Sequence, residues 1–146
     1  MARVLLDTSV LVAAVLPQHE HHAATAAELR RRRTAGDEFV LAAHAVTEAY
    51  AVLTRLPPPH RLAPADAIAV LDRNWGRAPT FGLTPSETWR IVRELAAAGV
   101  GGGRVYDAVI ARSARKAEAT ILLTWNIRHF GDRPGITVVT PLPVSS

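Results

Sequence analysis

Short apolar runs alternate along the chain with longer segments in which apolar residues recur every three or four positions. The short runs predict β-strands at residues 4–6, 39–41, 79–83, 120–124 and 137–139. The longer segments predict α-helices at residues 8–16, 20–34, 44–55, 63–75, 85–98 and 104–117. The first run, Val4-Leu5-Leu6, is wholly apolar, which is typical of a strand buried on both faces of a parallel sheet.

Residues with strong local preferences predict how several of these helices begin and end. Thr8 or Ser9 can cap the first helix, and Pro17 ends it. The segment Thr84-Pro85-Ser86-Glu87 has the spacing of a capping box with proline in the first turn. Residues 30–33, all arginine, predict a solvated helix end, where positive charge is favourable.

The alternation of strands and helices predicts an α/β fold in which helices cover a parallel sheet. Residues 1–146 contain no internal repeat and no domain boundary, so we expect a single domain. In such sheets a ligand site lies beyond the carboxyl ends of the strands, near the point where strand order reverses. The polar residues that follow the strands, Asp7 and Asn126 among them, are therefore the first functional candidates.

The composition supports a folded domain and excludes several other classes of protein. Apolar residues make up 49% of the chain and charged residues 21%, as in folded soluble proteins. The absence of cysteine excludes disulfides and thiolate metal sites. No apolar run reaches the ~18 residues that a membrane helix needs, so we expect a cytoplasmic protein.

The chain is basic, with a formal net charge of +4 and a pI near 10.6. A pI above about 9 is typical of proteins that bind nucleic acid. All but one of the Lys and Arg residues are arginine, whose planar fork suits phosphate recognition. An arginine-rich, lysine-poor composition is also common in proteins from GC-rich genomes, so composition alone leaves both interpretations open.

Three acidic residues lie in apolar surroundings, where an unpaired carboxylate is costly. Asp7 ends the first strand, Glu48 lies in an almost uncharged helix, and Asp107 lies in the first turn of another helix. Each can be explained singly, because Asp7 can cap a helix and Asp107 can interact with a helix dipole. Together, in a chain without cysteine, they form the oxygen ligand set that Mg²⁺ prefers.

Four motifs in chain order resemble those of PIN-domain ribonucleases. They are MARVLLDTSVL at 1–11, Thr47-Glu48, YDAVIA at 106–111 and LLTWNIRHF at 122–130. The length and the small helical insert resemble the VapC-type toxins of bacterial toxin–antitoxin pairs. The resemblance spans the whole chain and implies a three-layer PIN-like fold, with a central, mostly parallel sheet of about five strands and helices on both faces. It also implies endonucleolytic cleavage of RNA that depends on Mg²⁺ or Mn²⁺.

The resemblance implies roles for particular acids. Asp7, Glu48 and Asp107 correspond to the acidic cluster that holds the metal, and Glu48 also orients or deprotonates the attacking water. Asn126 falls where many members have a fourth acid, and it completes the catalytic set here. Because an amide carries no charge, the site has three formal negative charges instead of four. Asp132 is a second candidate for the missing acid.

Further residues are expected to support the site. The hydroxyl groups expected to hydrogen-bond the acids and fix their rotamers are those of Thr8, Ser9 and Thr124. The candidates for binding RNA are Arg112, Arg115 and Lys116, through phosphate, and Trp125, through base stacking. The resemblance also implies a cognate antitoxin that covers the cleft, and a homodimer.

Two other functions remain open on the sequence. A non-catalytic PIN-like RNA-binding module is favoured by Asn126, because a depleted acidic site binds metal less well. An acid-phosphatase-like hydrolase would use Asp7 as its nucleophile, but Ser9 stands where that chemistry needs a second acid. The tract His19-Glu20-His21-His22 lacks the spacing of a zinc-binding helix motif and is not expected to be a functional metal site.

Overall fold

Five parallel strands form the central sheet of this chain, for which the computed structural model describes residues 1–141. They are β1 (Arg3–Leu6), β2 (Glu38–Ala42), β3 (Thr80–Phe81), β4 (Ile121–Leu123) and β5 (Thr137–Val139). Their order is β3-β2-β1-β4-β5, and each neighbouring pair is parallel. The expectation of a parallel sheet of about five strands is confirmed. The interpretation of residues 1–146 as a single domain stays a prediction. Residues 142–146 lie outside the part that the structure describes.

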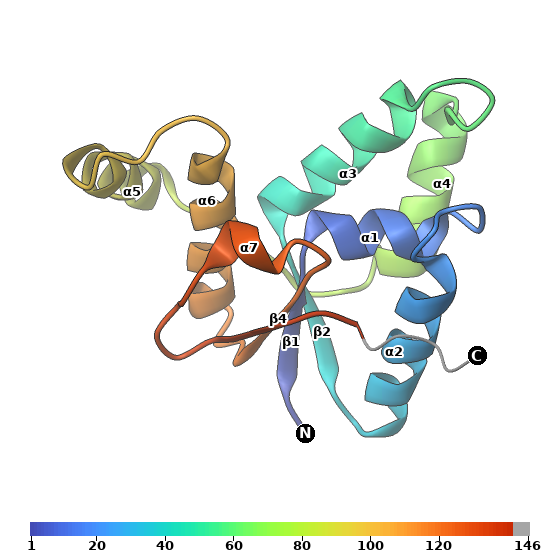
Figure 1. Ribbon diagram of the computed structural model, residues 1–146, viewed down its shortest axis with the longest axis horizontal. Coiled ribbons are helices and arrows are strands. Elements are labelled where there is room, and N and C mark those ends of the chain that lie inside the picture. The colour runs from blue at the N-terminus through green and yellow to red at the C-terminus, as the bar shows by residue number, and fades with distance from the viewer. Residues whose placement is uncertain (142–146) are drawn as a thin grey trace.

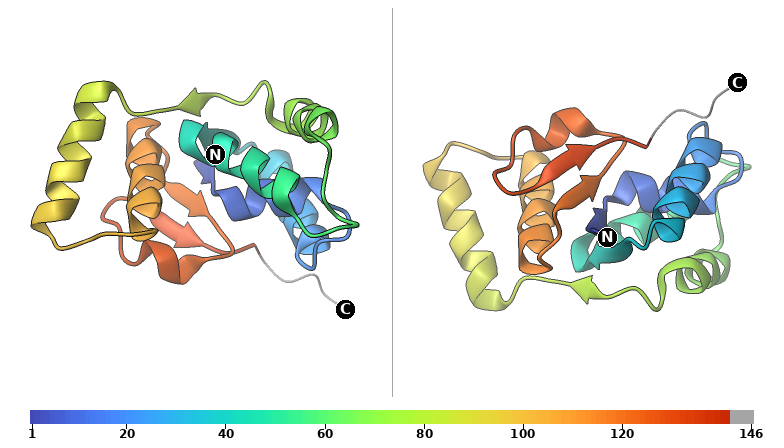
Figure 2. Two further views of the ribbon diagram at one scale, coloured as in Figure 1. Left: turned by 90° about the horizontal axis from the view of Figure 1, so that it is seen from above. Right: turned by 90° about the horizontal axis from the view of Figure 1, so that it is seen from below.

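Within the described residues seven helices flank the sheet, so that helices and sheet together form three layers. The helices are α1 (Thr8–Val15), α2 (His22–Thr34), α3 (Ala43–Arg55), α4 (Pro64–Trp75), α5 (Pro85–Ala97), α6 (Arg104–Lys116) and α7 (Ile127–Phe130). Figure 1 shows α1, α2 and α4 on one side of the sheet and α5, α6 and α7 on the other. Figure 2, from above and below, shows α5 as an outer arm beside α6. Among the described helices, none is both long and apolar enough to cross a membrane.

The centre of the sheet is the core of the molecule. Val4, Leu5 and Leu6 of β1 are completely buried, as are Leu122 and Leu123 of the adjacent β4. A central parallel strand has helices on both faces, so all of its side chains need to be apolar. The order reverses at β1, because the connection from β1 leads to β2 on one side while β4 arrives on the other. The carboxyl ends of β1 and β4 therefore define the expected ligand position.

The start of α1 differs from the sequence-based expectation. Asp7 occupies the N-cap position, and its side chain makes no capping hydrogen bond, whereas Thr8 and Ser9 lie inside the first turn. The Ser9 hydroxyl instead donates to the Asp7 carboxylate, with Oγ 3.0 Å from Oδ2. The prediction that Thr8 or Ser9 caps this helix was wrong. The Ser9 hydroxyl hydrogen-bonds the Asp7 carboxylate, and the Thr8 hydroxyl hydrogen-bonds the Glu48 carboxylate.

The arginine run at the end of α2 is more than a solvated helix end. Glu28 is 1% exposed and forms ion pairs with Arg31 and Arg32, the latter 2.8 Å from Nε to Oε1. Arg32 also binds Asp37 at 3.2 Å. The Arg33 guanidinium lies over the Phe39 ring. Three of the four arginines thus make contacts either with the buried Glu28 of the same helix or with residues at the start of β2.

The capping box at the start of α5 is confirmed. Thr84 Oγ1 accepts a hydrogen bond from the Glu87 amide at 3.1 Å, and Glu87 Oε1 accepts one from the Thr84 amide at 2.9 Å. Two ion pairs then hold α5 against α6, Lys116–Glu87 at 2.7 Å and Arg112–Glu94 at 2.5 Å.

Candidate active site

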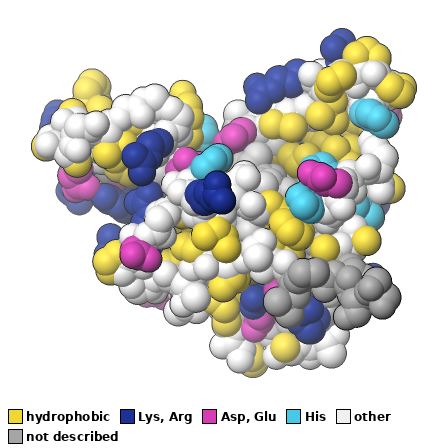
Figure 3. Space-filling model, viewed as in Figure 1, with side chains coloured by type: hydrophobic (Ala, Val, Ile, Leu, Met, Phe, Trp, Pro, Cys, Tyr) yellow, Lys and Arg dark blue, Asp and Glu magenta, His cyan; other side chains and the backbone are white. Residues whose placement is uncertain are grey.

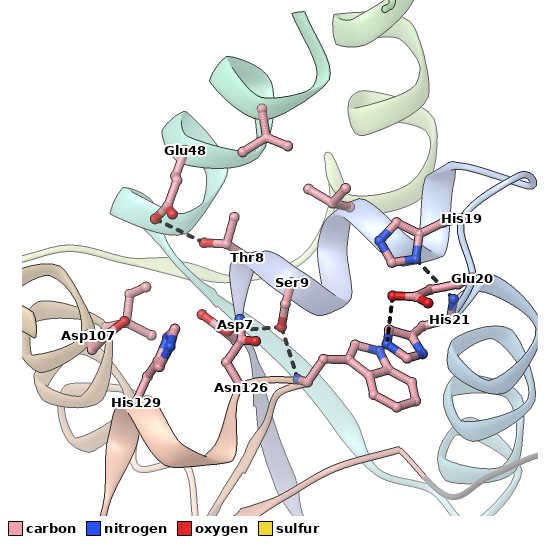
Figure 4. A pocket seen from close by; sticks show the side chains of 14 residues that line it. Asp7, Thr8, Ser9, His19, Glu20, His21, Glu48, Asp107, Asn126 and His129 are labelled. Carbon is pink, nitrogen blue, oxygen red and sulfur yellow. Dashed lines mark hydrogen bonds and ion pairs between the residues drawn. The ribbon is translucent and has the colours of Figure 1, made fainter. Parts of the chain in front are cut away.

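A cavity of about 410 Å³ opens beyond the carboxyl ends of β1 and β4. Figure 3 shows this region as a hollow, with acidic and histidine side chains around it and arginine or lysine at its margins. Figure 4 shows the side chains that line it. They include all four residues predicted to be catalytic, together with three histidines and one tryptophan: Asp7, Glu48, Asp107, Asn126, His19, His21, His129 and Trp125.

Asp7 is the most rigidly held of the acids. It is only 5% exposed, and its amide donates to the Leu123 carbonyl at 3.0 Å, which joins the ends of β1 and β4. Its Oδ2 accepts hydrogen bonds from Thr124 Oγ1 at 2.7 Å and from Ser9 Oγ at 3.0 Å. Two hydroxyl donors on one oxygen fix the rotamer of the carboxylate. The expected support by Ser9 and Thr124 is thus present in the geometry.

Glu48 reaches the cavity from the first half of α3. Its Oε2 accepts a hydrogen bond from Thr8 Oγ1 at 3.3 Å and lies 3.3 Å from His44 Nε2, one helical turn earlier. The side chain is 40% exposed, and Figure 4 shows it on the far side of Thr8 from Asp7. Glu48 is therefore more accessible to solvent than Asp7, as an acid that orients or deprotonates water needs to be.

Asp107 lies in the first turn of α6, at the same end of the cavity as Glu48, with His129 beside it (Figure 4). Burial raises the pKa of its carboxyl above the usual range, and the nearby Asp7 and Glu48 carboxylates raise it further. His129 and Arg133 oppose this shift. The three acids, from three different parts of the chain, are therefore close enough to repel one another.

Asn126 forms the lower edge of the site. Its amide donates to Thr124 Oγ1 at 2.9 Å, and it is the N-cap residue of the short helix α7. The backbone of Thr124, Trp125 and Asn126 is thus tied to Ser9 and Asp7 through hydroxyl groups. Asn126 lines the same cavity as the three acids, whereas Asp132 lies outside it.

The donor set of this cavity fits a hard divalent cation. Carboxylate, hydroxyl and amide oxygens are the ligands that Mg²⁺ and Mn²⁺ prefer, and a cation would offset the repulsion that raises the pKa of Asp107. Within residues 1–141, however, no three Asp, Glu or His side chains are gathered closely enough to form a ready ligand set. Oδ2 of Asp7 contacts Ser9 and Thr124, and Oε2 of Glu48 contacts Thr8 and His44.

The predicted RNA-binding residues divide into two groups. Trp125 lines the acidic cavity. Arg112 and Lys116 are engaged in ion pairs with α5, and Arg115 lines a separate small cavity between α5 and α6. Arg112 and Lys116 therefore face α5. The role of all three residues as phosphate contacts stays a prediction.

Sequence reasoning gave little weight to several residues that belong to the site. His19, Glu20 and His21 form one wall of the cavity, although their spacing excludes a helical metal motif. His44 contacts Glu48 and stacks on Tyr106, and no spacing rule connects α3 with the start of α6. The one signal available was the placement of His44 one turn before Glu48, and of Tyr106 directly before Asp107.

Comparison with known families identifies the chain. The model of the PIN domain matches residues 4–132. The chain belongs to the PIN-domain family. Two curated relatives are Ribonuclease VapC40 and Ribonuclease VapC27 of Mycobacterium tuberculosis, 40% and 39% identical to this chain over 116 residues. Each alignment covers 80% of this chain, and 81% and 80% of the respective relative.

Solved structures of low sequence identity have the same PIN fold. VapBC2 from Rickettsia felis, bound to a promoter DNA fragment, matches with a TM-score of 0.67 and 17% identity, over 94% of this chain and 98% of that one. DNA-bound VapBC from Salmonella typhimurium matches with a TM-score of 0.66 and 23% identity, over 97% and 100%. The three-layer PIN-like fold expected from the motifs is therefore confirmed.

Proposed function

We propose that this PIN-domain protein is a metal-dependent endoribonuclease and the toxin of a toxin–antitoxin pair. The observation that carries the proposal is the convergence of Asp7, Glu48 and Asp107 on one cavity, from β1, α3 and α6. The names of the two VapC relatives support RNA as the substrate. The clustered acids and the basic character of the whole chain agree with a site that handles a phosphodiester through a cation.

In the proposed mechanism Asp7, Asp107 and Glu48 would hold Mg²⁺, for which Mn²⁺ would substitute. A bound divalent cation supplies Lewis-acid chemistry, since it acidifies water and offsets the charge that develops on the phosphate. Ser9 and Thr124 keep Asp7 in one rotamer. Glu48 orients the attacking water or takes its proton, and Asn126 contributes its amide oxygen through a water. In-line attack leaves a 5′-phosphate and a 3′-hydroxyl.

The same proposal includes protein partners. The two neighbouring solved structures named above are VapBC complexes, which supports a cognate antitoxin for this chain. A cavity with three carboxylates favours a basic side chain of that antitoxin, which would replace the cation and block the site. We further propose a homodimer, and action in the cytoplasm, where cellular RNA is accessible.

Loss of Asp107 tests the ribonuclease directly. We expect Asp107→Asn, which keeps the size of the side chain but removes its charge, to abolish cleavage while the protein stays folded. The measurement maps new 5′-phosphate ends in total bacterial RNA incubated with purified, antitoxin-free protein, with Mg²⁺ or with EDTA. Asp132→Asn is the matched control, because Asp132 is exposed and outside the cavity. Cleavage that survives in folded Asp107→Asn, or in EDTA, contradicts the proposal.

A second function is favoured by one specific observation, the amide at position 126. With three carboxylates instead of four, the protein would serve as a PIN-like module that binds RNA without cutting it. This alternative predicts that wild-type protein binds RNA but produces no new ends, even with Mn²⁺ in excess. Titration of wild type and Asp107→Asn with Mn²⁺ separates the two functions, since only the enzyme requires metal affinity that depends on Asp107.

A further inference from the structure

Two pairs of stacked aromatic rings lie beside the acidic cavity. The His44 and Tyr106 rings are nearly parallel, with centroids 4.8 Å apart and planes at 7°. The His21 and Trp125 rings are also nearly parallel, with centroids 3.9 Å apart and planes at 9°. Each pair joins residues distant in sequence, so tertiary structure alone creates both.

The two pairs lie at opposite ends of the acidic cluster. Tyr106 directly precedes Asp107, and His44 lies 3.3 Å from Glu48, so the first pair borders these two acids. Figure 4 shows His21 at the other end of the cavity from Asp107 and Glu48, with Asp7 and Asn126 between them. A phosphodiester held at the acids therefore has an aromatic pair on each side.

The first pair contributes little to the fold. Tyr106 remains 55% exposed although one face of its ring is covered by His44. A stack that served stability would bury more of the tyrosine, because stabilisation follows the apolar area removed from water. The open face of Tyr106 is thus available to a planar ligand.

The second pair is held in a fixed orientation. The Trp125 indole donates from Nε1 to Oγ1 of Thr25, which is fully buried, at 2.8 Å. The Trp125 amide donates to Ser9 Oγ at 3.0 Å, and Ser9 also contacts Asp7. His21 lies on this anchored indole and keeps 39% of its own side chain exposed. The plane of the pair is therefore set relative to Asp7 before any ligand arrives.

We propose that the His44–Tyr106 and His21–Trp125 pairs are two base-stacking subsites that flank the phosphodiester bound at the acids. The substrate class is then an unpaired stretch of RNA whose two bases splay apart, one onto each pair. A duplex does not fit, because its bases are already stacked on one another. Aromatic platforms accept every base through its π-face, so these subsites select unpaired RNA more than a particular sequence. This inference rests on the proposed function and adds the residues that would hold the two bases beside the cleaved bond.

Binding measured without cleavage tests the subsites. The probe is a fluorescein-labelled, 12-nucleotide single-stranded RNA of mixed sequence, titrated with Asp107→Asn protein in Mg²⁺ and followed by anisotropy. Stacking contributes about 1–3 kcal/mol per base, which corresponds to roughly a 5- to 150-fold loss of affinity when the platform is removed. We expect such a loss for Tyr106→Ala, and a smaller one for His21→Ala, in the same background.

Two further variants distinguish stacking from a loss of structure. Tyr106→Phe retains the ring and is expected to recover most of the affinity that Tyr106→Ala loses. Trp89→Ala is the matched control, because Trp89 is a 63% exposed aromatic residue on α5, outside the acidic cavity. Circular dichroism melting curves verify that each variant is folded. We expect the same RNA annealed to its complement to bind more weakly than the single strand.

The outcomes for the subsites and for the ribonuclease are distinguishable. If Tyr106→Ala binds the single strand within twofold of its parent, or if the duplex binds equally well, the subsites are refuted even when wild-type protein cleaves RNA. Absence of single-strand binding by Asp107→Asn also refutes them. If binding requires Tyr106 but wild-type protein makes no metal-dependent ends, the subsites stand and the ribonuclease is refuted.

Discussion

Asp7 shows how single atoms prepare this site. Both hydroxyl donors act on the same oxygen, Oδ2, and both come from residues beside the strand ends, Ser9 and Thr124. Oriented hydroxyl groups of this kind hold a ligating carboxylate in place before metal binds. Asn126 is the contrasting case, because its amide lies in the cavity but adds no charge. The residue at position 126 therefore decides whether the site has three or four formal negative charges.

We expect Asn126→Asp to strengthen Mn²⁺ binding by roughly tenfold, since cation affinity rises with the number of charged ligands. Isothermal titration of wild type and variant with Mn²⁺ measures the change. Asn74→Asp, on the exposed surface of α4, is the control for a general effect of added charge. An unchanged or weaker affinity in Asn126→Asp would show that position 126 does not contribute to the cation site.

The helices on the two sides of the sheet are attached to the site in different ways. Helices α1 and α3 pack against each other and carry their functional residues directly above β1 and β2. Helix α5 touches the rest mainly through α6, by Ile91 and by the two ion pairs of Glu87 and Glu94. Lys116 is central to this attachment, since it binds both Glu87 and the Gly82 carbonyl.

The attachment of α5 gives a pH-dependent prediction. Hydrogen bonds from Lys116 and from Thr84 lower the pKa of Glu87 to about 2. A lowered pKa stabilises the folded state at pH values above the ordinary value of 4.5, and this contribution disappears as the pH falls toward 2. We expect Glu87→Gln to expose α5 amides to faster hydrogen exchange at pH 6, with a difference from wild type that shrinks between pH 4.5 and pH 2.

Protection factors of the α5 amides, measured by mass spectrometry or NMR, provide this comparison. Glu118→Gln is a suitable control, because Glu118 is exposed beyond the end of α6. A difference between wild type and Glu87→Gln that stays constant down to pH 2 would mean that another interaction holds α5.

At the scale of the whole molecule, the site brings carboxylates together that repel one another. Three carboxylates from distant parts of the chain converge, and burial together with the other two acids raises the pKa of Asp107. The fold brings these charges together although their repulsion opposes folding. Natural proteins accept such local cost at functional sites, where a ligand supplies the missing compensation.

The repulsion between these carboxylates predicts how the stability of the protein against urea responds to metal. In EDTA at neutral pH we expect Asp107→Asn to unfold at a higher urea concentration than wild type, because it removes one repelled, partly buried charge. Mn²⁺ at ~100 times its dissociation constant should stabilise wild type by about 2.7 kcal/mol and Asp107→Asn far less. Asp132→Asn serves again as control. If Mn²⁺ stabilises wild type and Asp107→Asn equally, the cation does not bind at the acids.

Local signals were sufficient for most of the fold. The apolar run at 4–6 requires burial on both faces, and the capping box at 84–87 begins a helix through contacts three residues apart. Helix α7 was missed, because four residues carry too weak a periodic signal. Helix α2 begins at His22 and not at Glu20; the His21 amide just before it donates to Nδ1 of His19, a contact that the helical pattern did not indicate.

For the site, the sequence by itself predicted the three acids that line the cavity, since each is a charged residue in an apolar stretch next to a predicted strand or within a predicted helix. Only the tertiary structure decided what surrounds them. It joined Tyr106 to His44 and Trp125 to His21, and it turned Arg112 and Lys116 away toward α5. The physical reason is the sequence separation of the residues that interact. Caps, strands and amphipathic helices depend on neighbours a few residues apart. Ring stacks and ion pairs between helices depend on how the layers pack, which no local pattern encodes.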